Sequence, residues 1–172
     1  MKALCLVAHP DDCIIFGYSY IHNHPEMDWT IGYLTYTAAD ARGQEISAFW
    51  QRRDIPCVFL GYVDDYQDLE TKKISFDTVQ ACKDLQSLSD QFDLVLTHDA
   101  DGDYGHLHHV FVHDCVQHHA NLVTFAKLGS GTVTLTVPPD TYDLAELPQH
   151  QHIVASFFPG GQHRNNYTEV AQ

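Results

Sequence analysis

The stretch ALCLVAHPDDC, residues 3–13, joins an apolar run to a polar turn. An apolar run of this length is typical of a buried strand, and this one ends in a histidine, a proline and two adjacent carboxylates. Open α/β sheets bind ligands at the carboxyl ends of their strands, so these polar groups lie where a site is expected. The next segment has apolar residues at helical spacing, namely Ile14, Tyr18 and Ile21. His9 and Asp12 are therefore expected on a strand-to-helix turn, close enough to converge on one point.

Strand-like runs alternate with helical patterns in the first two thirds of the chain. The runs rich in apolar, β-branched and aromatic residues are 29–36, 56–61 and 92–98. A helix with Ile46, Phe49 and Trp50 on its inner face follows residues 37–40, which have the form of a capping box, and another is expected over about 71–89. This alternation predicts an α/β fold with a doubly wound, Rossmann-like and mostly parallel sheet that has helices on both faces.

The chain of 172 residues is expected to form one domain over residues 1–172, because no repeat, low-complexity tract or linker divides it. The pattern is weaker after His119. Residues 132–137 and 153–158 are expected to be strands, and residues from about 160 onward a loosely held tail.

Composition and charge restrict the partners and the compartment. Lys and Arg number 9 against 23 Asp and Glu, which gives a formal net charge of −14. A field of this sign repels phosphate backbones and anionic membranes, so general nucleic-acid binding is not expected. No apolar run approaches the about 18 residues that span a bilayer, and the first residues lack a basic leader. Four of the five cysteines, Cys5, Cys57, Cys82 and Cys115, lie in apolar segments and are expected to be reduced thiols, as in a cytoplasmic protein.

A second polar stretch, residues 99–109, reads DADGDYGHLHH and opens another predicted helix. His106, His109 and His113 share one stripe of that helix, because they are spaced at i, i+3 and i+7. A catalytic zinc ion has three protein ligands and keeps a position for water. His9, Asp12 and one histidine of residues 105–109 would supply two imidazoles and one carboxylate.

The remaining groups suit hydrolysis of an amide. Asp11 is next to a ligand, where its carboxylate could take a proton from the metal-bound water. A histidine one helical turn from the ligand histidine could hold the developing oxyanion or protonate the leaving amine.

The order of these motifs resembles that of the LmbE-like, or PIG-L, deacetylases, which remove acetyl groups from N-acetylglucosamine-type amines. The likeness comprises Ala-His-Pro-Asp-Asp after a strand, the strand end Phe59-Leu60-Gly61 with Asp64 behind it, and a late Asp-Tyr-Gly-His-x-x-His, and it extends from about Lys2 to His119. The resemblance implies zinc on His9, Asp12 and His109, with Asp11 as general base. His106 resembles the histidine that stabilises the oxyanion or serves as acid, and Tyr104 a tyrosine of that pocket. Arg42 and Asp64 resemble residues that grip sugar hydroxyls.

The chain departs from the family pattern at two places. Cys13 stands where the family usually has Glu, and Leu107-His108 where it usually has Pro-Asp. Three alternatives therefore stay open: a non-sugar N-acyl substrate, iron(II) or another divalent ion in place of zinc, and a non-catalytic carbohydrate-binding protein of the same fold. In each enzymatic case the partner would be a small molecule or a glycoconjugate. Asp99 is the expected carboxylate that orients a ligand histidine, and His113 is expected behind the ligands or at the surface.

Overall fold

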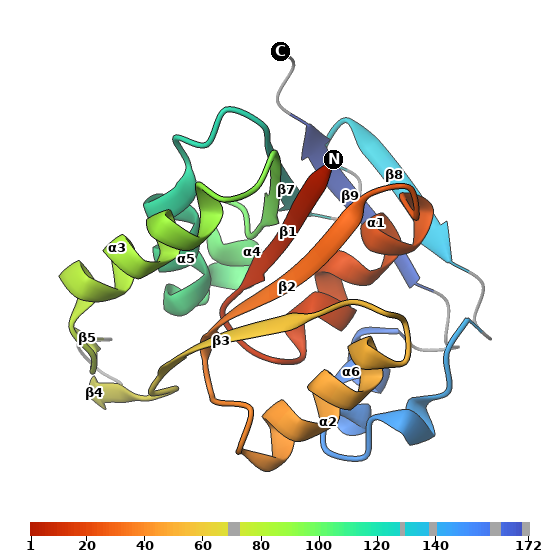
Figure 1. Cartoon of the computed structure of the whole chain (residues 1–172), viewed down its shortest axis with the longest axis horizontal. Coiled ribbons are helices and arrows are strands. Elements are labelled where there is room, and N and C mark those ends of the chain that lie inside the picture. Colours follow the sequence, from red (N-terminus) through yellow and green to blue (C-terminus); the bar gives the residue numbers. More distant parts are fainter. Residues whose placement is uncertain (69–72, 128–129, 138–140, 159–162, 170–172) are drawn as a thin grey trace.

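The computed structural model of the chain describes residues 1–68, 73–127, 130–137, 141–158 and 163–169. Its main element is a seven-stranded sheet with the strand order β3-β2-β1-β6-β7-β9-β8 (Figure 1). The strands of this sheet are β1 (Lys2–Val7), β2 (Asp28–Thr35), β3 (Cys57–Tyr62), β6 (Leu94–Thr97), β7 (Leu122–Ala126), β8 (Val133–Val137) and β9 (His163–Glu169). A separate ribbon pairs β4 (Tyr66–Asp68) with β5 (Lys73–Ile74).

The chain winds outward from β1 in two directions. β1 pairs in parallel with β2 and with β6, so that Cys5 lies opposite Ile31 on one side and Leu96 on the other. β3 and β7 extend the parallel part, whereas β9 runs antiparallel to both β7 and β8. The prediction of a mostly parallel sheet is confirmed. The carboxyl ends of β1 and β6 flank a topological switch point, where doubly wound folds bind their ligands.

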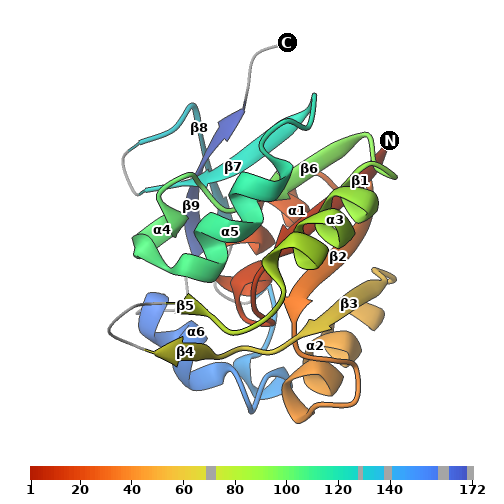
Figure 2. The same ribbon diagram turned by 90° about the vertical axis from the view of Figure 1, so that its left-hand side faces the viewer.

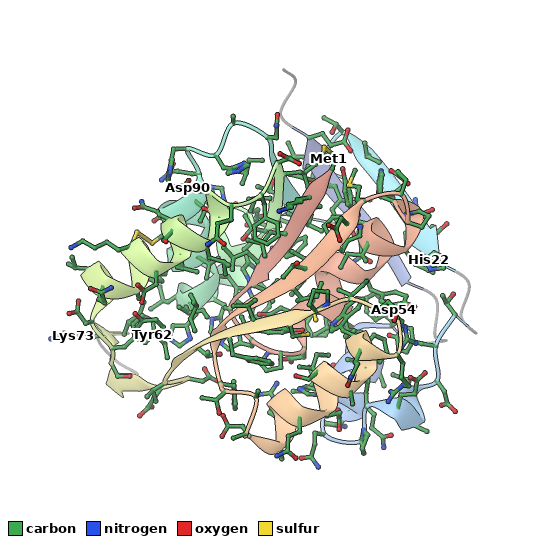
Figure 3. All side chains as sticks on the ribbon, in the orientation of Figure 1. Met1, His22, Asp54, Tyr62, Lys73 and Asp90 are labelled. Atoms are coloured by element: carbon green, nitrogen blue, oxygen red, sulfur yellow. A yellow bond between two sulfur atoms is a disulfide. The ribbon has the colours of Figure 1, made fainter. Side chains whose placement is uncertain are left out.

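Successive residues of β1 face two different cores. Ala3, Cys5 and Val7 pack into one core, and Leu4, Leu6 and Ala8 into the other, all of them fully buried. A strand that is buried on both faces needs cover on both faces, as predicted. The first face is covered by η1 (Cys13–Gly17), α1 (Tyr18–Asn23) and α2 (Ala41–Gln51), and the second by α3 (Thr78–Ser89) and α5 (Leu107–Val116) (Figures 1 and 2). Side chains fill the space between these layers (Figure 3).

Three shorter helices complete the described structure: α4 (Gly102–Gly105), η2 (Leu144–Glu146) and α6 (Gln151–Phe157). None of the helices in the described ranges has the length and apolar character needed to cross a bilayer. The helix expected over 71–89 begins only at Thr78, where Asp77 caps it by accepting from the backbone of Val79 and Gln80; residues 71–72 lie outside the described residues. The capping box expected over residues 37–40 does not cap a helix there. The helix α2 begins only at Ala41, and Asp40 accepts hydrogen bonds from the backbone N–H and the hydroxyl of Thr37.

Two expectations for the last third of the chain are wrong. Residues 153–158, expected as a strand, belong mainly to α6, where Val154 is buried and Ile153 and Phe157 are exposed. A short apolar run does not distinguish a strand from a helix, which explains the error. The expected loose tail instead contains β9, which lies between β7 and β8. Its polar sequence is held by side-chain hydrogen bonds of Asn165 and Asn166 rather than by alternating apolar residues.

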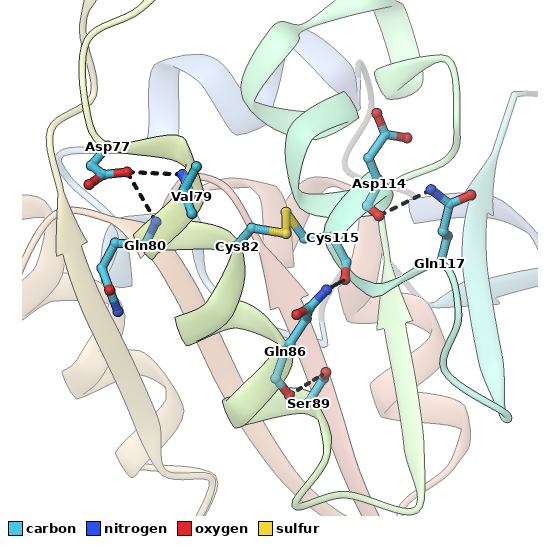
Figure 4. Close-up of a disulfide and its surroundings, with 9 residues drawn as sticks. All are labelled: Asp77, Val79, Gln80, Cys82, Gln86, Ser89, Asp114, Cys115 and Gln117. Carbon is cyan, nitrogen blue, oxygen red and sulfur yellow. Dashed lines mark hydrogen bonds between the residues drawn. A yellow bond between two sulfur atoms is a disulfide. The ribbon is translucent and has the colours of Figure 1, made fainter.

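Helices α3 and α5 are joined by a disulfide between Cys82 and Cys115 (Figure 4). The Cα atoms of the two cysteines are 5.3 Å apart, and Gln86 on α3 also donates to the backbone carbonyl of Cys115. The expectation that these two thiols are reduced is therefore wrong, because packing of the helices brings together cysteines that lie 33 residues apart. Cys5, Cys13 and Cys57 are free thiols. The cysteines thus do not support the expected cytoplasmic location.

Candidate metal and hydrolytic site

The predicted site residues gather at the carboxyl ends of β1 and β6, at the switch point of the sheet. His9, Asp11 and Asp12 follow β1, and the segment after β6 returns to the same edge through α4. Sharp turns at residues 102–105 direct this segment toward the site. Gly102 and Gly105 have positive φ angles, and so does Asp103 at 64°, a conformation that non-glycine residues seldom adopt. The side chain of Asp99 holds that turn by accepting from the backbone N–H of Asp103 at 2.8 Å.

Three donor atoms form a small triangle at the centre of the site. His9 Nδ1 lies 3.0 Å from Asp12 Oδ2, Asp12 Oδ2 lies 3.2 Å from His109 Nε2, and the two nitrogens lie 3.2 Å apart. All three side chains are buried. A tetrahedral zinc ion, with bonds of about 2.0–2.1 Å to N and O, separates its ligand atoms by about 3.3 Å. The triangle therefore has the dimensions of three ligands of one ion.

The outer ring nitrogens of His109 and His9, which point away from the triangle, each lie beside a carboxylate oxygen. His109 Nδ1 lies 2.8 Å from Asp103 Oδ2, and His9 Nε2 lies 3.2 Å from Asp64 Oδ1. Because an ionised carboxylate only accepts, each of these outer nitrogens can carry a proton that faces its carboxylate. With the outer nitrogens protonated, the inner nitrogens can direct their unshared pairs at one cation beside Asp12 Oδ2. The donor set thus fits a divalent metal ion.

The pKa shifts of His9, His109 and Asp12 show that this cluster favours positive charge beside the Asp12 carboxylate. Burial alone would lower the pKa of His9 and His109, but the Asp12 carboxylate outweighs it and raises the pKa of His9 to about 10 and that of His109 to about 9. Burial would raise the pKa of Asp12, yet the two histidines hold it well below its usual range.

Asp103 is the carboxylate that orients His109, a role expected for Asp99. Its Oδ2 also accepts from His98 Nδ1 at 2.5 Å, while His98 Nε2 accepts from the backbone of Ala8 at 3.0 Å. The rings of His98 and His109 stack with centroids 3.8 Å apart. Burial would raise the pKa of Asp103, but these two histidines lower it to about 2. His98 was not among the predicted site residues, although it lies at the end of a predicted strand, where site residues are expected.

Asp11 lies beside the triangle, and Arg42 holds one of its oxygens. Arg42 Nη2 donates to Asp11 Oδ1 at 2.5 Å, and Asp11 is 7% exposed. Burial and the neighbouring Asp12 raise the pKa of Asp11, and Arg42 offsets part of that rise. A buried carboxylate with a raised pKa next to a metal-capable cluster is suited to accept a proton. Arg42, expected on the substrate, thus also contacts the candidate base.

Asp64 lies on the other side of His9. Besides His9 Nε2, its Oδ1 faces His108 Nδ1 at 3.5 Å, and its Oδ2 accepts from Tyr36 Oη at 3.0 Å. Burial would raise the pKa of Asp64, but hydrogen bonds from His108 and His9 hold it well below its usual range. Asp64 therefore orients His9, a role the sequence did not suggest. His108, which replaces the usual family Asp, is buried 3.2 Å from His9 Nε2.

His106 and Tyr104 form one wall of the site. The centroid of the His106 ring lies 4.6 Å from those of His9 and His109. Burial, together with the positive charge of His9 and His109, lowers the pKa of His106 to about 3, so its imidazole is neutral at pH 7. Tyr104 is 60% exposed at the rim, with its ring 5.9 Å from that of His106. His113, expected outside the ligand set, bonds through Nδ1 to the carbonyl of His98.

Comparisons with known proteins identify a family for the chain. The family model described as PIG-L: GlcNAc-PI de-N-acetylase matches residues 4–120. No curated protein sequence matches the chain significantly.

Among solved structures, a deacetylase in the teicoplanin biosynthesis pathway has a TM-score of 0.65 at 14% identity, over 99% of this chain and 98% of that one. The zinc-inhibited form of the teicoplanin deacetylase Orf2 gives 0.64 at 13%, over 99% and 98%. GalB, the 4-carboxy-2-hydroxymuconate hydratase of Pseudomonas putida KT2440, gives 0.69 at 12%, over 99% and 96%. At these identities the structures share the fold. The family match covers most of the chain and includes every residue of the triangle, and so the chain belongs to the PIG-L family of de-N-acetylases.

Proposed function

We propose that the chain is a zinc-dependent hydrolase that removes the acetyl group from an N-acetylated amino sugar of the N-acetylglucosamine type. The observation that carries the proposal is the triangle of His9 Nδ1, Asp12 Oδ2 and His109 Nε2, with the Asp11 carboxylate beside it. These three residues would hold the ion, which when bound supplies the positive charge that activates water and polarises an amide carbonyl. The family membership supports the same reaction.

Asp11 is the proposed general base. Arg42 binds its Oδ1, so the proton of the attacking water would pass to Oδ2. His106 is neutral at pH 7 and can donate an N–H to the oxyanion that forms at the former carbonyl oxygen. The Tyr104 hydroxyl, at the exposed rim, is the proposed second group of that pocket.

The sugar would lie toward Arg42 and Asp64. Arg42 donates three of its N–H groups within the protein, to Asp11, Tyr36 and His150. A guanidinium has five such donors, so two are not used in these contacts among the described residues and could bind sugar hydroxyls. The side chains of Arg42 and Asp64 are 24% and 27% exposed, which leaves them accessible from the site.

Metal content and acetate release, measured on the same samples, test the proposal. Asp11→Asn should keep the metal and lower acetate release from N-acetylglucosamine derivatives by about 100-fold or more, because it removes only the base. His109→Ala should lose both metal and activity. Asp101→Asn is the matched control, since that carboxylate is exposed and paired with Lys127 at the surface.

Two results would contradict the proposal. Full activity of Asp11→Asn would show that another group takes the proton. A metal-loaded wild-type protein that releases no acetate from any N-acetyl sugar would exclude the sugar substrate, and non-sugar N-acyl amines would then be assayed in the same way.

A further inference from the structure

The guanidinium of Arg42 is held from behind by a buried histidine. Arg42 Nε lies 3.1 Å from His150 Nε2, and His150 is fully buried. His150 is far away in the sequence, in the turn that precedes α6, and lies outside the residues that the family model matches. The segment after residue 120 therefore reaches the hydrolytic site through this contact.

The protonation of His150 follows from its partners. Arg42 Nε can only donate, so His150 Nε2 must accept and the proton of the neutral imidazole lies on Nδ1. Nδ1 is 2.6 Å from Glu45 Oε1, and the Glu45 carboxylate also accepts from the backbone N–H groups of Gln149 and His150. The hydrogen bonds thus run in one direction, from Arg42 to His150 and from His150 to Glu45.

The Nη1 and Nη2 atoms of Arg42 contact the residues of the hydrolytic site. Nη2 donates to Asp11 Oδ1 at 2.5 Å, and Nη1 donates to Tyr36 Oη at 2.9 Å. Tyr36 in turn donates to Asp64, the carboxylate beside His9. The first turn of α2 is pressed close to the preceding loop at Gly43, where an added Cβ would lie 2.0 Å from the Thr37 carbonyl oxygen. This close packing restrains the backbone next to Arg42. The long side chain of Arg42 needs contacts of its own to hold it in one conformation.

We propose that Glu45 and His150 are positioning residues of the hydrolytic site, which act through Arg42 on Asp11. An arginine side chain has many rotamers and loses conformational entropy when it is fixed in one of them. The His150 contact fixes the Nε end, and the planar guanidinium then has one orientation in which it reaches both Asp11 and Tyr36. This inference rests on the proposed function, because it assigns Asp11 the role of base.

Two isosteric variants of His150 separate this role from a merely structural one. In His150→Gln the side-chain carbonyl can take the place of Nε2 and accept from Arg42. In His150→Asn the amide can take the place of Nδ1 and donate to Glu45, but it does not reach Arg42. If His150 only attaches the turn before α6 to Glu45, the Asn variant should function better than the Gln variant. If His150 positions Arg42, the Gln variant should function better than the Asn variant.

The test compares kcat and KM for acetate release by the zinc-loaded wild-type protein and both variants. His150→Asn should lower kcat about 10- to 100-fold with little change in KM, because a misplaced catalytic group costs rate at this scale. His150→Gln should restore most of kcat. Glu146→Gln is the matched control, since Glu146 also ties the segment after residue 120 to arginines of the α2 end, Arg52 and Arg53, without a contact to Asp11. Its kcat should equal that of the wild type.

A second readout does not depend on activity. The Arg42 Nε–H signal in ¹H–¹⁵N NMR spectra should be protected from exchange with water in the wild type and in His150→Gln, and exposed to exchange in His150→Asn. If the wild type hydrolyses its substrate and the two His150 variants have equal kcat and equal protection, the positioning role is refuted. If the wild type hydrolyses no N-acyl substrate while the NMR pattern is as expected, the proposed function is wrong, but the contact by which His150 positions Arg42 is confirmed.

Discussion

Asp103 decides which nitrogen of His109 carries a proton, and therefore whether Nε2 can bind a metal ion. Its backbone conformation, with φ 64° and ψ −59°, suits glycine. Asp103→Gly removes the carboxylate without backbone strain and should weaken zinc binding about 10- to 100-fold, as is usual when a carboxylate behind a ligand histidine is lost. Asp103→Asn should lie between this variant and the wild type, because its amide oxygen can still accept. Competition with a chelator measures the affinities.

The control for Asp103 comes from the same loop. Asp101→Gly removes a carboxylate whose side chain is 74% exposed and should leave the zinc affinity unchanged. Equal zinc affinity of Asp103→Gly and the wild type would show that the tautomer of His109 is set by another group.

At single positions, the sequence predicted the residues that follow local rules. His9 and Asp12 are three residues apart on one turn, and the histidine that meets them comes from residues 105–109, as expected; that it is His109 was implied only by the family resemblance. The roles of Asp103 and His150 could not be predicted in this way. The first depends on a positive φ angle, and the second on a contact between residues 108 positions apart. Neither leaves a periodic signal in the sequence.

Between elements, the disulfide is the strongest constraint on α3 and α5. A cross-link that closes a loop of this size stabilises a fold by about 3–4 kcal/mol in the chain-entropy model. Cys82→Ala should therefore lower the free energy of unfolding by about that amount, measured by denaturant titration, and reductant should lower that of the wild type similarly. Cys57→Ala is the control, because Cys57 is a free thiol and its variant should respond to reductant as the wild type does. No effect of reductant, together with five titratable thiols in the unreduced protein after denaturation, would contradict the pairing.

Glu146 provides a pH-dependent link between η2 and the end of α2. Burial would raise its pKa, but hydrogen bonds from Arg53 and Arg52 lower it to about 2 from an ordinary 4.5. Since the folded pKa lies below the unfolded one, the stabilisation is complete above pH 4.5 and is lost as the pH falls toward 2. Glu146→Gln should thus be less stable than the wild type at pH 7, by about 1 kcal/mol because solvent screens this partly exposed group, and the difference should vanish near pH 2. A difference that stays constant with pH would exclude the ion pairs as its source.

On the scale of the whole molecule, the strands β1, β2, β3, β6 and β8 followed from apolar runs in the sequence, whereas the parallel strand β7 and the antiparallel strand β9 did not. β1, β2, β3 and β6 are short apolar strands, and each was predicted within a few residues. β9 is polar, and Asn166 is buried in it because its amide bonds to Thr134 and to the Lys127 carbonyl. Hydrogen bonds of this kind join residues that are far apart in the sequence, so periodicity could not indicate them.

The charge of the whole molecule should select among substrates of the proposed reaction. A net charge of −14, with 23 acidic against 9 basic residues, repels anions over about a Debye length, about 10 Å at 0.1 M salt. For an N-acetyl sugar that carries a phosphate, kcat/KM should therefore rise several-fold between about 0.02 and about 0.3 M NaCl, as screening removes the repulsion. The neutral sugar of the same structure is the control and should change little. A fall in kcat/KM of the phosphorylated sugar over this range would mean that a local cation such as Arg42 binds the phosphate strongly enough to outweigh the field of the molecule.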